Sequence, residues 1–487
     1  MIVRKIINRS LHNNFVIQVQ LRCLSTSIKM SKAPSSPSVT QNQANFSRFS
    51  ANTILTGTDF IKISDYDCVG FDLDNTLLRY KLSEMISLEY DVLSRYLVEH
   101  KGYSAKYLLR PLKDDLDFLQ KGLITDFARG NILKISFDGY IGKAAHGTRM
   151  LSETEIAEVY GEDRKWNATS KFCRDLLIAW QGDLSTEMRT LLDYFDMPSS
   201  LAFARIVDSL DAKNGNKPLE RYDIWPDILD GLTEMFQREH FQNDRSAYFA
   251  EMKRNPAKYI HVTNDNVRNW LKQLKKEKTL FLLTGSHIDF ANLTATYALG
   301  ENWQDLFDIV VCFAKKPGFF SGQRPFKALN GFEETEQTVA ADELKLGVTY
   351  SQGNWNDLMH CLSVKTKTDK PKVLYVGDNL LQDVYAPNKF CGSDTISIAE
   401  ELLAEGMNNV DADHEDDDFL TSNTWGSYFT NNDEPSIWLD VIRKYSKICI
   451  PTISTLASQP IDHPFKCFTQ KMCVNGFYPS EPQNLTN

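Results

Sequence analysis

The sequence contains no Cys-x-x-Cys pair, the spacing on which many zinc sites and redox motifs are built. Its nine cysteines are scattered and odd in number, at positions 23, 68, 173, 312, 361, 391, 449, 467 and 473. A disulfide framework and a structural zinc site are therefore disfavoured, and a reducing compartment is the simpler interpretation.

The chain also lacks long apolar runs and an excess of positive charge. No apolar run reaches the roughly 18 residues that suggest a membrane-spanning helix. The formal net charge is −10, which argues against the broad basic surface that binds nucleic-acid backbones. We therefore expect neither a membrane nor a nucleic acid as the main partner. A small phosphorylated substrate remains compatible with this charge, and so does a homo-oligomer.

Acidic residues are absent from the first 58 positions, whereas basic residues recur there at positions 4, 5, 9, 22, 29, 32 and 48. This composition, with an arginine at the start of RCLSTS (22–27), predicts a mitochondrial transit peptide over residues 1–29 and a mitochondrial location. The alternative is translation from Met30, which would give a cytoplasmic protein. Residues 30–60 are polar and rich in Ser, Pro and Asn, so we expect a disordered linker.

Short apolar segments bounded by charged or glycine-containing turns are typical of strands buried in a parallel sheet. Helical patterns lie between them, and an alternation of strands and helices predicts an α/β fold with a doubly wound parallel sheet. We assign the catalytic core to residues 61–79 and 263–405. The predicted strands cover residues 68–73, 279–283, 309–313 and 373–376, with 395–398 as a candidate fifth.

The interval over residues 80–262 is too long for a single crossover between two strands. It opens with apolar residues at helical spacing over 86–97, followed by Gly102 as a helix-ending glycine. We therefore expect a separate, mainly helical cap domain inserted after the first strand. Residues 406–487 form a C-terminal extension, and the acidic run at 410–419 is interpreted as a solvated loop.

Two carboxylates follow the first predicted strand, in the segment Asp72-Leu73-Asp74-Asn75-Thr76. At a strand end, both can converge on one cation. Asp72 is a candidate nucleophile that would form an aspartyl-phosphate, and Asp74 a candidate general acid and base. Thr76 would support the turn. Taken alone, the segment fits an Asp-rich backbone turn equally well.

The next two predicted strands end in groups that suit a phosphate. Thr284 and Gly285 follow the second strand and offer a hydroxyl and backbone N–H groups to a phosphoryl oxygen. Lys316 follows the third strand and can balance charge on the nucleophile and the phosphoryl group. Each signal is weak by itself, because turns commonly carry such residues.

The fourth predicted strand is followed by Asp378, with Asp383 five positions later. Asp378, the Asp72 carboxylate and the Asp74 carbonyl would form a Mg²⁺ site, because magnesium prefers one or two carboxylates together with phosphate and water oxygens. Asp383 could orient Lys316 or bind the metal through water. Since the carboxyl ends of parallel strands meet at one edge, all of these groups are expected to converge there.

The ordered appearance of Asp/Asp, Thr, Lys and Asp/Asp at four successive strand ends resembles the four motifs of the haloacid dehalogenase superfamily. Longer segments resemble the cytosolic purine 5′-nucleotidase family over roughly residues 64–460. They are FDLDNTLLRYKL (71–82), LFDIVVCFAKKPGFF (306–320), YSQGN (350–354), VLYVGDNLLQDV (373–384) and WGSYF (425–429).

This resemblance implies Mg²⁺-dependent hydrolysis of phosphate monoesters, preferably nucleoside 5′-monophosphates, through an aspartyl-phosphate. It selects Lys316, which directly precedes proline, over Lys315, and it implies that the cap helps to define the substrate. Phosphotransfer to another alcohol is a variant. The alternative is a catalytically idle nucleotide- or protein-binding member of the same fold. The presence of Asp74 argues against an idle protein, because the resemblance implies that members that do not hydrolyse phosphate esters have no need of an acid at this position.

Overall fold

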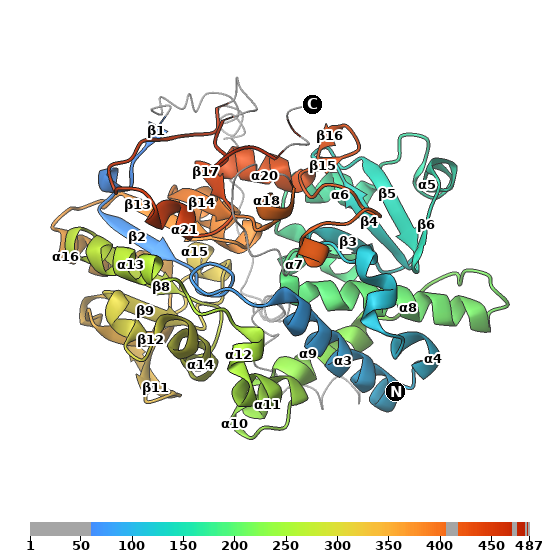
Figure 1. Ribbon diagram of the computed structural model, residues 1–487, viewed down its shortest axis with the longest axis horizontal. Helices are drawn as coiled ribbons and strands as arrows, with labels where there is room; N and C mark the ends of the chain where they lie inside the picture. Colours follow the sequence, from blue (N-terminus) through green and yellow to red (C-terminus); the bar gives the residue numbers. More distant parts are fainter. Residues whose placement is uncertain (1–59, 406–416, 470–474, 483–484, 486–487) are drawn as a thin grey trace, which may run out of the picture.

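A nine-stranded sheet forms the centre of one half of the molecule (Figure 1). The computed structural model describes residues 60–405, 417–469, 475–482 and 485. The seven strands from β12 to β17 are parallel, and β10 and β11 form an antiparallel hairpin at one edge. The order is β11 (Glu333–Val339), β10 (Phe326–Asn330), β12 (Val348–Gln352), β9 (Ile309–Cys312), β8 (Thr279–Leu283), β2 (Cys68–Phe71), β13 (Val373–Gly377), β14 (Asp394–Ile398) and β17 (Ile448–Ile450).

Both faces of this sheet are buried at its central strands β2, β8, β9 and β13, where every residue is buried although successive side chains point to opposite faces. In β8, Leu280 and Leu282 join one hydrophobic cluster, whereas Phe281 and Leu283 join another. Helices α13 (Asp265–Glu277) and α14 (Ile288–Leu299) pack into the first cluster, and α16 (Trp355–Thr366) packs into the second. The predicted α/β fold with a doubly wound parallel sheet is therefore confirmed.

The strands expected from the sequence are all present, with bounds that agree to within two residues. The predicted helix before Gly102 is also present as α3 (Leu82–Lys101), and Gly102 ends it in a left-handed conformation with φ of 74°. Because a left-handed residue without a Cβ carries little steric cost, glycine suits this position.

The insert between β2 and α13 contains the expected helices and also a sheet that the sequence analysis did not predict. This five-stranded antiparallel sheet has the order β6 (Arg149–Met150), β5 (Ile141–His146), β4 (Asn131–Ile135), β3 (Leu123–Asp126) and β7 (Met188–Leu191). The helices of the insert are α3, α4 (Ala105–Leu108), α5 (Glu153–Tyr160), α6 (Asn167–Phe172), α7 (Ile178–Gln181), α8 (Met197–Lys213), α9 (Trp225–Phe236), α10 (Arg238–Gln242), α11 (Ala247–Arg254) and α12 (Pro256–Tyr259).

The C-terminal segment joins the two halves of the molecule rather than forming a unit of its own (Figure 1). Its strand β17 extends the central sheet, and β18 (Phe465–Lys466) pairs with β1 (Phe60–Ile61). Between α19 (Asp417–Leu420) and β17 it packs on the insert, through β15 (Thr430–Asn431), β16 (Glu434–Pro435) and α20 (Ile437–Tyr445). The indole N–H groups of Trp425 and Trp438 donate to the carbonyls of Phe118 and Gly122, each at 2.7 Å.

Several expectations fall on parts of the chain outside the described residues. These are the transit peptide over 1–29, nearly all of the linker over 30–60 and most of the acidic run at 410–419. Within the described ranges, no helix combines the length and apolar character needed to cross a membrane. The cysteines described there are free thiols, at positions 68, 173, 312, 361, 391, 449 and 467.

Candidate active site

The turn after β2 directs Asp72 and Asp74 to the carboxyl edge of the sheet. The N–H of Asp72 still pairs with the carbonyl of Val376 in β13 at 2.9 Å. The chain then folds around the buried Leu73, whose carbonyl accepts the N–H groups of residues 76, 77 and 78 at 3.3, 3.0 and 3.1 Å. Because Leu73 points into the core, the two flanking carboxylates can both face the cavity above the sheet.

Two hydroxyl groups from different parts of the chain donate short hydrogen bonds to Asp74, and the hydroxyl of Thr284 lies farther away, at 3.5 Å from Oδ2. The hydroxyl of Tyr80 donates to Oδ1 at 2.7 Å, and that of Ser286 donates to Oδ2 at 2.9 Å. Burial, followed by the charge of Asp72, raises the pKa of Asp74 to about 6, although both hydrogen bonds oppose this. A carboxyl group with this pKa can exist in either protonation state near neutral pH, as a general acid and base requires.

Lys316 links two carboxylates at the floor of the site. Its Nζ lies 2.7 Å from Oδ1 of Asp72 and 2.6 Å from Oδ1 of Asp383, and the lysine is only 2% exposed. Burial lowers the pKa of Lys316, but the charges of Asp383 and Asp72 outweigh it and raise the pKa well above its usual value. Lys316 is therefore a permanent positive charge beside the candidate nucleophile. Lys315 instead lies over the ring of Phe313, at 4.3 Å.

The end of β13 places Asp378 and Asp383 on the other side of Asp72. Asp378 accepts a hydrogen bond from the hydroxyl of Thr76 at 3.3 Å, which ties it to the first turn. Asp383 lies in the π-helical turn η8 (Leu380–Tyr385), and its Oδ2 accepts the N–H of Asn379 at 3.2 Å. Gly377 makes this packing possible, because a Cβ there would lie 2.4 Å from Cβ of Asp383.

The donor set at this edge fits a divalent cation that prefers oxygen. Asp72, Asp378 and Asp383 each offer one carboxylate oxygen, and these atoms lie within 4.8 Å of one another. Both carboxylate oxygens of Asp383 already accept hydrogen bonds, from Lys316 and from the N–H of Asn379, whereas Lys316 contacts only Oδ1 of Asp72. Asp72 and Asp378 are therefore the better placed pair. Burial raises the pKa of Asp378 well above its usual value, as do the charges of Asp193 and Asp72. A cation would relieve this repulsion, and carboxylate oxygens are the side-chain ligands that magnesium prefers.

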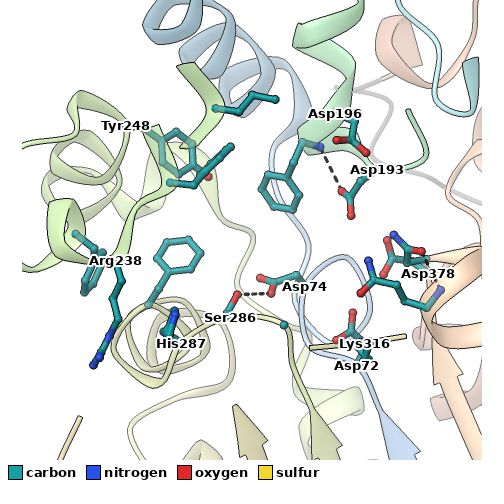
Figure 2. Close-up of a pocket in the computed structure, with 18 of the residues that line it drawn as sticks. Asp72, Asp74, Asp193, Asp196, Arg238, Tyr248, Ser286, His287, Lys316 and Asp378 are labelled. Atoms are coloured by element: carbon teal, nitrogen blue, oxygen red, sulfur yellow. Dashed lines mark hydrogen bonds and ion pairs between the residues drawn. The ribbon is translucent and has the colours of Figure 1, made fainter. Parts of the chain in front are cut away.

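A cavity extends from these carboxylates to an aromatic wall supplied mainly by the insert (Figure 2). Gly285, Ser286 and Asn379 line it near the strand ends, together with the catalytic candidates. The insert adds Asp193 and Asp196, and α10 adds Arg238, whose Nε lies 2.9 Å from Asp289 in α14. The apolar wall consists of Phe195, Leu232, Phe236, Phe241, Tyr248, Phe249 and, from the core, Phe290.

The sequence profile of the 5′ nucleotidase family matches residues 58–420, which include the first turn, the whole insert and the remaining strand ends. The chain belongs to the 5′ nucleotidase family. This membership confirms the resemblance seen in the motifs and classes the chain as a phosphoric monoester hydrolase of the 5′-nucleotidase type.

Individual members of this family resemble the chain over different lengths. The 5′-nucleotidase domain-containing protein 1 of Bos taurus is 37% identical over 449 residues, which cover 86% of this chain and 96% of the relative. The human protein of the same name is 36% identical over 451 residues, with the same coverage. The 5′-nucleotidase domain-containing protein 2 of Rattus norvegicus is 25% identical over 330 residues, which are 66% of this chain and 55% of the relative.

Within this nucleotidase fold, the residues singled out in the sequence lie around one edge of the sheet. Asp72, Asp74, Gly285, Lys316, Asp378 and Asp383 line the cavity, and Thr76 supports Asp378 from behind. Thr284 is fully buried, and its hydroxyl accepts the N–H of Ser286 at 3.0 Å. Its assignment as a phosphate ligand stays a prediction.

Three further residues of this site were not singled out by the sequence analysis, namely Tyr80, Ser286 and Asp193. Ser286 stood within the Thr-Gly-Ser turn, so its hydroxyl was a visible candidate. Tyr80 and Asp193 carry no local signal, because only the tertiary structure brings Tyr80 to Asp74 and Asp193 to the cavity.

Proposed function

We propose that this protein is a Mg²⁺-dependent phosphatase that hydrolyses nucleoside 5′-monophosphates through an aspartyl-phosphate on Asp72. One observation carries the proposal. Asp72, in contact with the buried Lys316, lies at the same edge of the sheet as Asp74. The carboxyl group of Asp74 in turn accepts hydrogen bonds from the hydroxyls of Tyr80 and Ser286. The first arrangement suits a nucleophile, and the second suits a proton donor and acceptor.

In the first half-reaction, a carboxylate oxygen of Asp72 attacks phosphorus as the bond between phosphorus and the ester oxygen breaks. Asp74 gives its proton to the departing ester oxygen. In the second half-reaction, Asp74 takes a proton from water as the water oxygen attacks phosphorus. The bond between phosphorus and Asp72 then breaks, which releases inorganic phosphate and restores the Asp72 carboxylate. Lys316 balances negative charge in both steps.

The carboxylates of Asp72 and Asp378 and the carbonyl of Asp74 would hold Mg²⁺, which supplies positive charge where a carboxylate must approach a phosphate dianion. Asp383 holds Lys316 in place through its 2.6 Å contact, which corresponds to one of the two roles expected for it. The hydroxyl of Thr76 supports Asp378.

The aromatic wall of the cavity supports a nucleoside as the leaving group. Phe195, Phe236 and Phe290 are only half-buried, so parts of their rings face the cavity. Aromatic surface of this kind stacks well on a planar base, whereas a small polar alcohol would leave it unfilled. The base preference depends on the groups between Tyr248 and Arg238, at the far end of the cavity from Asp378 (Figure 2).

The test is phosphate release from a panel of nucleoside monophosphates and p-nitrophenyl phosphate, with and without Mg²⁺, by the wild type and Asp72→Asn. We expect Mg²⁺-dependent release that Asp72→Asn abolishes, because an amide is a poor nucleophile. Saturable nucleotide binding without turnover would instead establish the idle binding protein. Transfer of phosphate to an added alcohol in preference to water would establish the phosphotransferase variant.

A further inference from the structure

Asp193 brings a carboxylate from the insert to the cavity that holds the cation-binding candidates. It follows β7 and precedes the short helical turn η5 (Tyr194–Asp196). The N–H of Phe195 donates to its Oδ1 at 3.2 Å, which fixes the direction of the side chain. Asp193 lines the same cavity as Asp72, Asp74 and Asp378, and Figure 2 shows it above them, on the side of the insert.

Within the described residues, no lysine or arginine forms an ion pair with Asp193. Lys121 acts on it electrostatically, but its Nζ lies 2.8 Å from Glu401 and 4.3 Å from the centre of the Tyr194 ring. Burial, followed by the charge of Asp196, raises the pKa of Asp193 to about 6. An unpaired carboxylate that is shielded from water costs free energy unless a ligand or an ion compensates its charge.

Asp193 shares its cavity with a carboxylate of the candidate cation site. Asp193 and Asp378 line this cavity from the insert and from the core, and in the described part of the chain no lysine or arginine forms an ion pair with either. The protein alone therefore places two unpaired carboxylates at one cavity, where their negative charges repel. A phosphate group would add to this repulsion, whereas a divalent cation would turn it into attraction.

We propose that Asp193 is a positioning residue for the divalent cation held by Asp72 and Asp378. Its charge favours the cation from the side of the insert, and the bound cation in turn holds Asp193 and the insert against the strand ends. This inference rests on the proposed metal-dependent function, because it needs the same cation.

The test compares full-length wild type, Asp193→Asn and Asp289→Asn without substrate. Titration calorimetry gives the Mg²⁺ dissociation constant, and thermal melting gives the stability with and without Mg²⁺. Asp193→Asn should raise the dissociation constant about 10-fold, the lower end of the effect of outer groups on metal sites. Asp289→Asn is the matched control, because Asp289 lines the same cavity but pairs with Arg238, so it should leave the Mg²⁺ affinity unchanged.

Melting separates this role from a purely structural one. The metal-free Asp193→Asn protein should melt at the wild-type temperature or above it, because a repulsion is removed. Its gain in melting temperature on adding Mg²⁺ should be smaller than that of the wild type. A metal-free protein that melts well below the wild type, with an unchanged Mg²⁺-induced gain, would overturn the proposal.

A further variant separates this proposal from the proposed function. An unchanged Mg²⁺ affinity in Asp193→Asn, with weakened binding in Asp378→Ala, would overturn the role of Asp193 and leave the metal-dependent phosphatase standing. An Asp193→Asn variant that raises only the KM for nucleotides would also overturn the role of Asp193 in cation binding, since its carboxylate would then contact the leaving group. The metal-dependent phosphatase would again stand. Unchanged Mg²⁺ binding in Asp378→Ala would overturn the metal site itself, and both proposals with it.

Discussion

Replacing Asp74 by asparagine should separate catalysis from stability. Asparagine has nearly the same shape, so its side-chain carbonyl can keep one of the two hydroxyl donors, Tyr80 or Ser286. Its amide group would face the other donor, and the loss of that single hydrogen bond costs about 1 kcal/mol of stability. The amide cannot exchange a proton at neutral pH. Loss of a general acid and base lowers turnover about 10²–10⁴-fold, equivalent to roughly 3–5 kcal/mol in the barrier.

The assay compares two leaving groups with the same folded variant. p-Nitrophenol leaves without help from an acid. The Asp74→Asn variant should therefore still transfer the phosphoryl group of p-nitrophenyl phosphate to Asp72. Because the second half-reaction needs a base, the enzyme should release about one equivalent of nitrophenol and then stall. A nucleoside is a poor leaving group and should give no such burst. Steady turnover of both substrates within tenfold of the wild type would refute the role of Asp74.

Four other changes test the same site and the start of the chain. Gly377→Ala should push Asp383 away from Lys316, cost about 1–3 kcal/mol in thermal unfolding and lower turnover; wild-type activity and melting would contradict the close approach. Asp378→Ala should raise the Mg²⁺ concentration needed for half-maximal activity, with turnover partly recovered at high Mg²⁺; a loss that Mg²⁺ does not affect would contradict its role. Lys316→Ala should lose activity and about 3–5 kcal/mol of stability in denaturant unfolding, because the buried carboxylates of Asp72 and Asp383 lose their shared partner. A loss of stability below about 1 kcal/mol would argue against charged contacts between Lys316 and these carboxylates. A reporter fused to residues 1–40 should enter mitochondria, whereas uniform cytosolic fluorescence of the full-length protein would favour a start at Met30.

Five strands of the central sheet, namely β2, β8, β9, β13 and β14, were predictable because they are short, almost wholly buried and, except for β14, largely apolar. In β8 all five residues are buried, so the run TLFLL stands out from its polar surroundings. The chemistry was predictable for a related reason. Parallel strands end at one edge, so Asp72, Lys316 and Asp378 had to lie near one another once their strands were recognised.

The sheet of the insert escaped prediction because its strands lack that contrast. β4 (NILKI) is fully buried but contains Asn131 and Lys134, whose side chains have specific partners. Lys134 donates to the carbonyl of Trp425 at 2.9 Å, in a segment almost 300 positions away. A local pattern treats a lysine in a strand as a solvent-facing residue, and only the tertiary structure provides the acceptor that permits its burial.

The same long-range contacts bear on how the cap could move. Lys134, Trp425 and Trp438 attach the sheet of the insert to the C-terminal segment, which continues through α20 into strand β17 of the core. A rigid rotation of the whole insert would have to break these buried contacts. Helices α10 and α11 carry much of the aromatic wall and lie at the lower edge of the molecule in Figure 1, away from the sheet of the insert. Opening of that part alone would break the ion pair between Arg238 and Asp289 and admit a substrate, while Asp193 would stay beside the catalytic carboxylates. The cation site and the aromatic wall therefore need not open together.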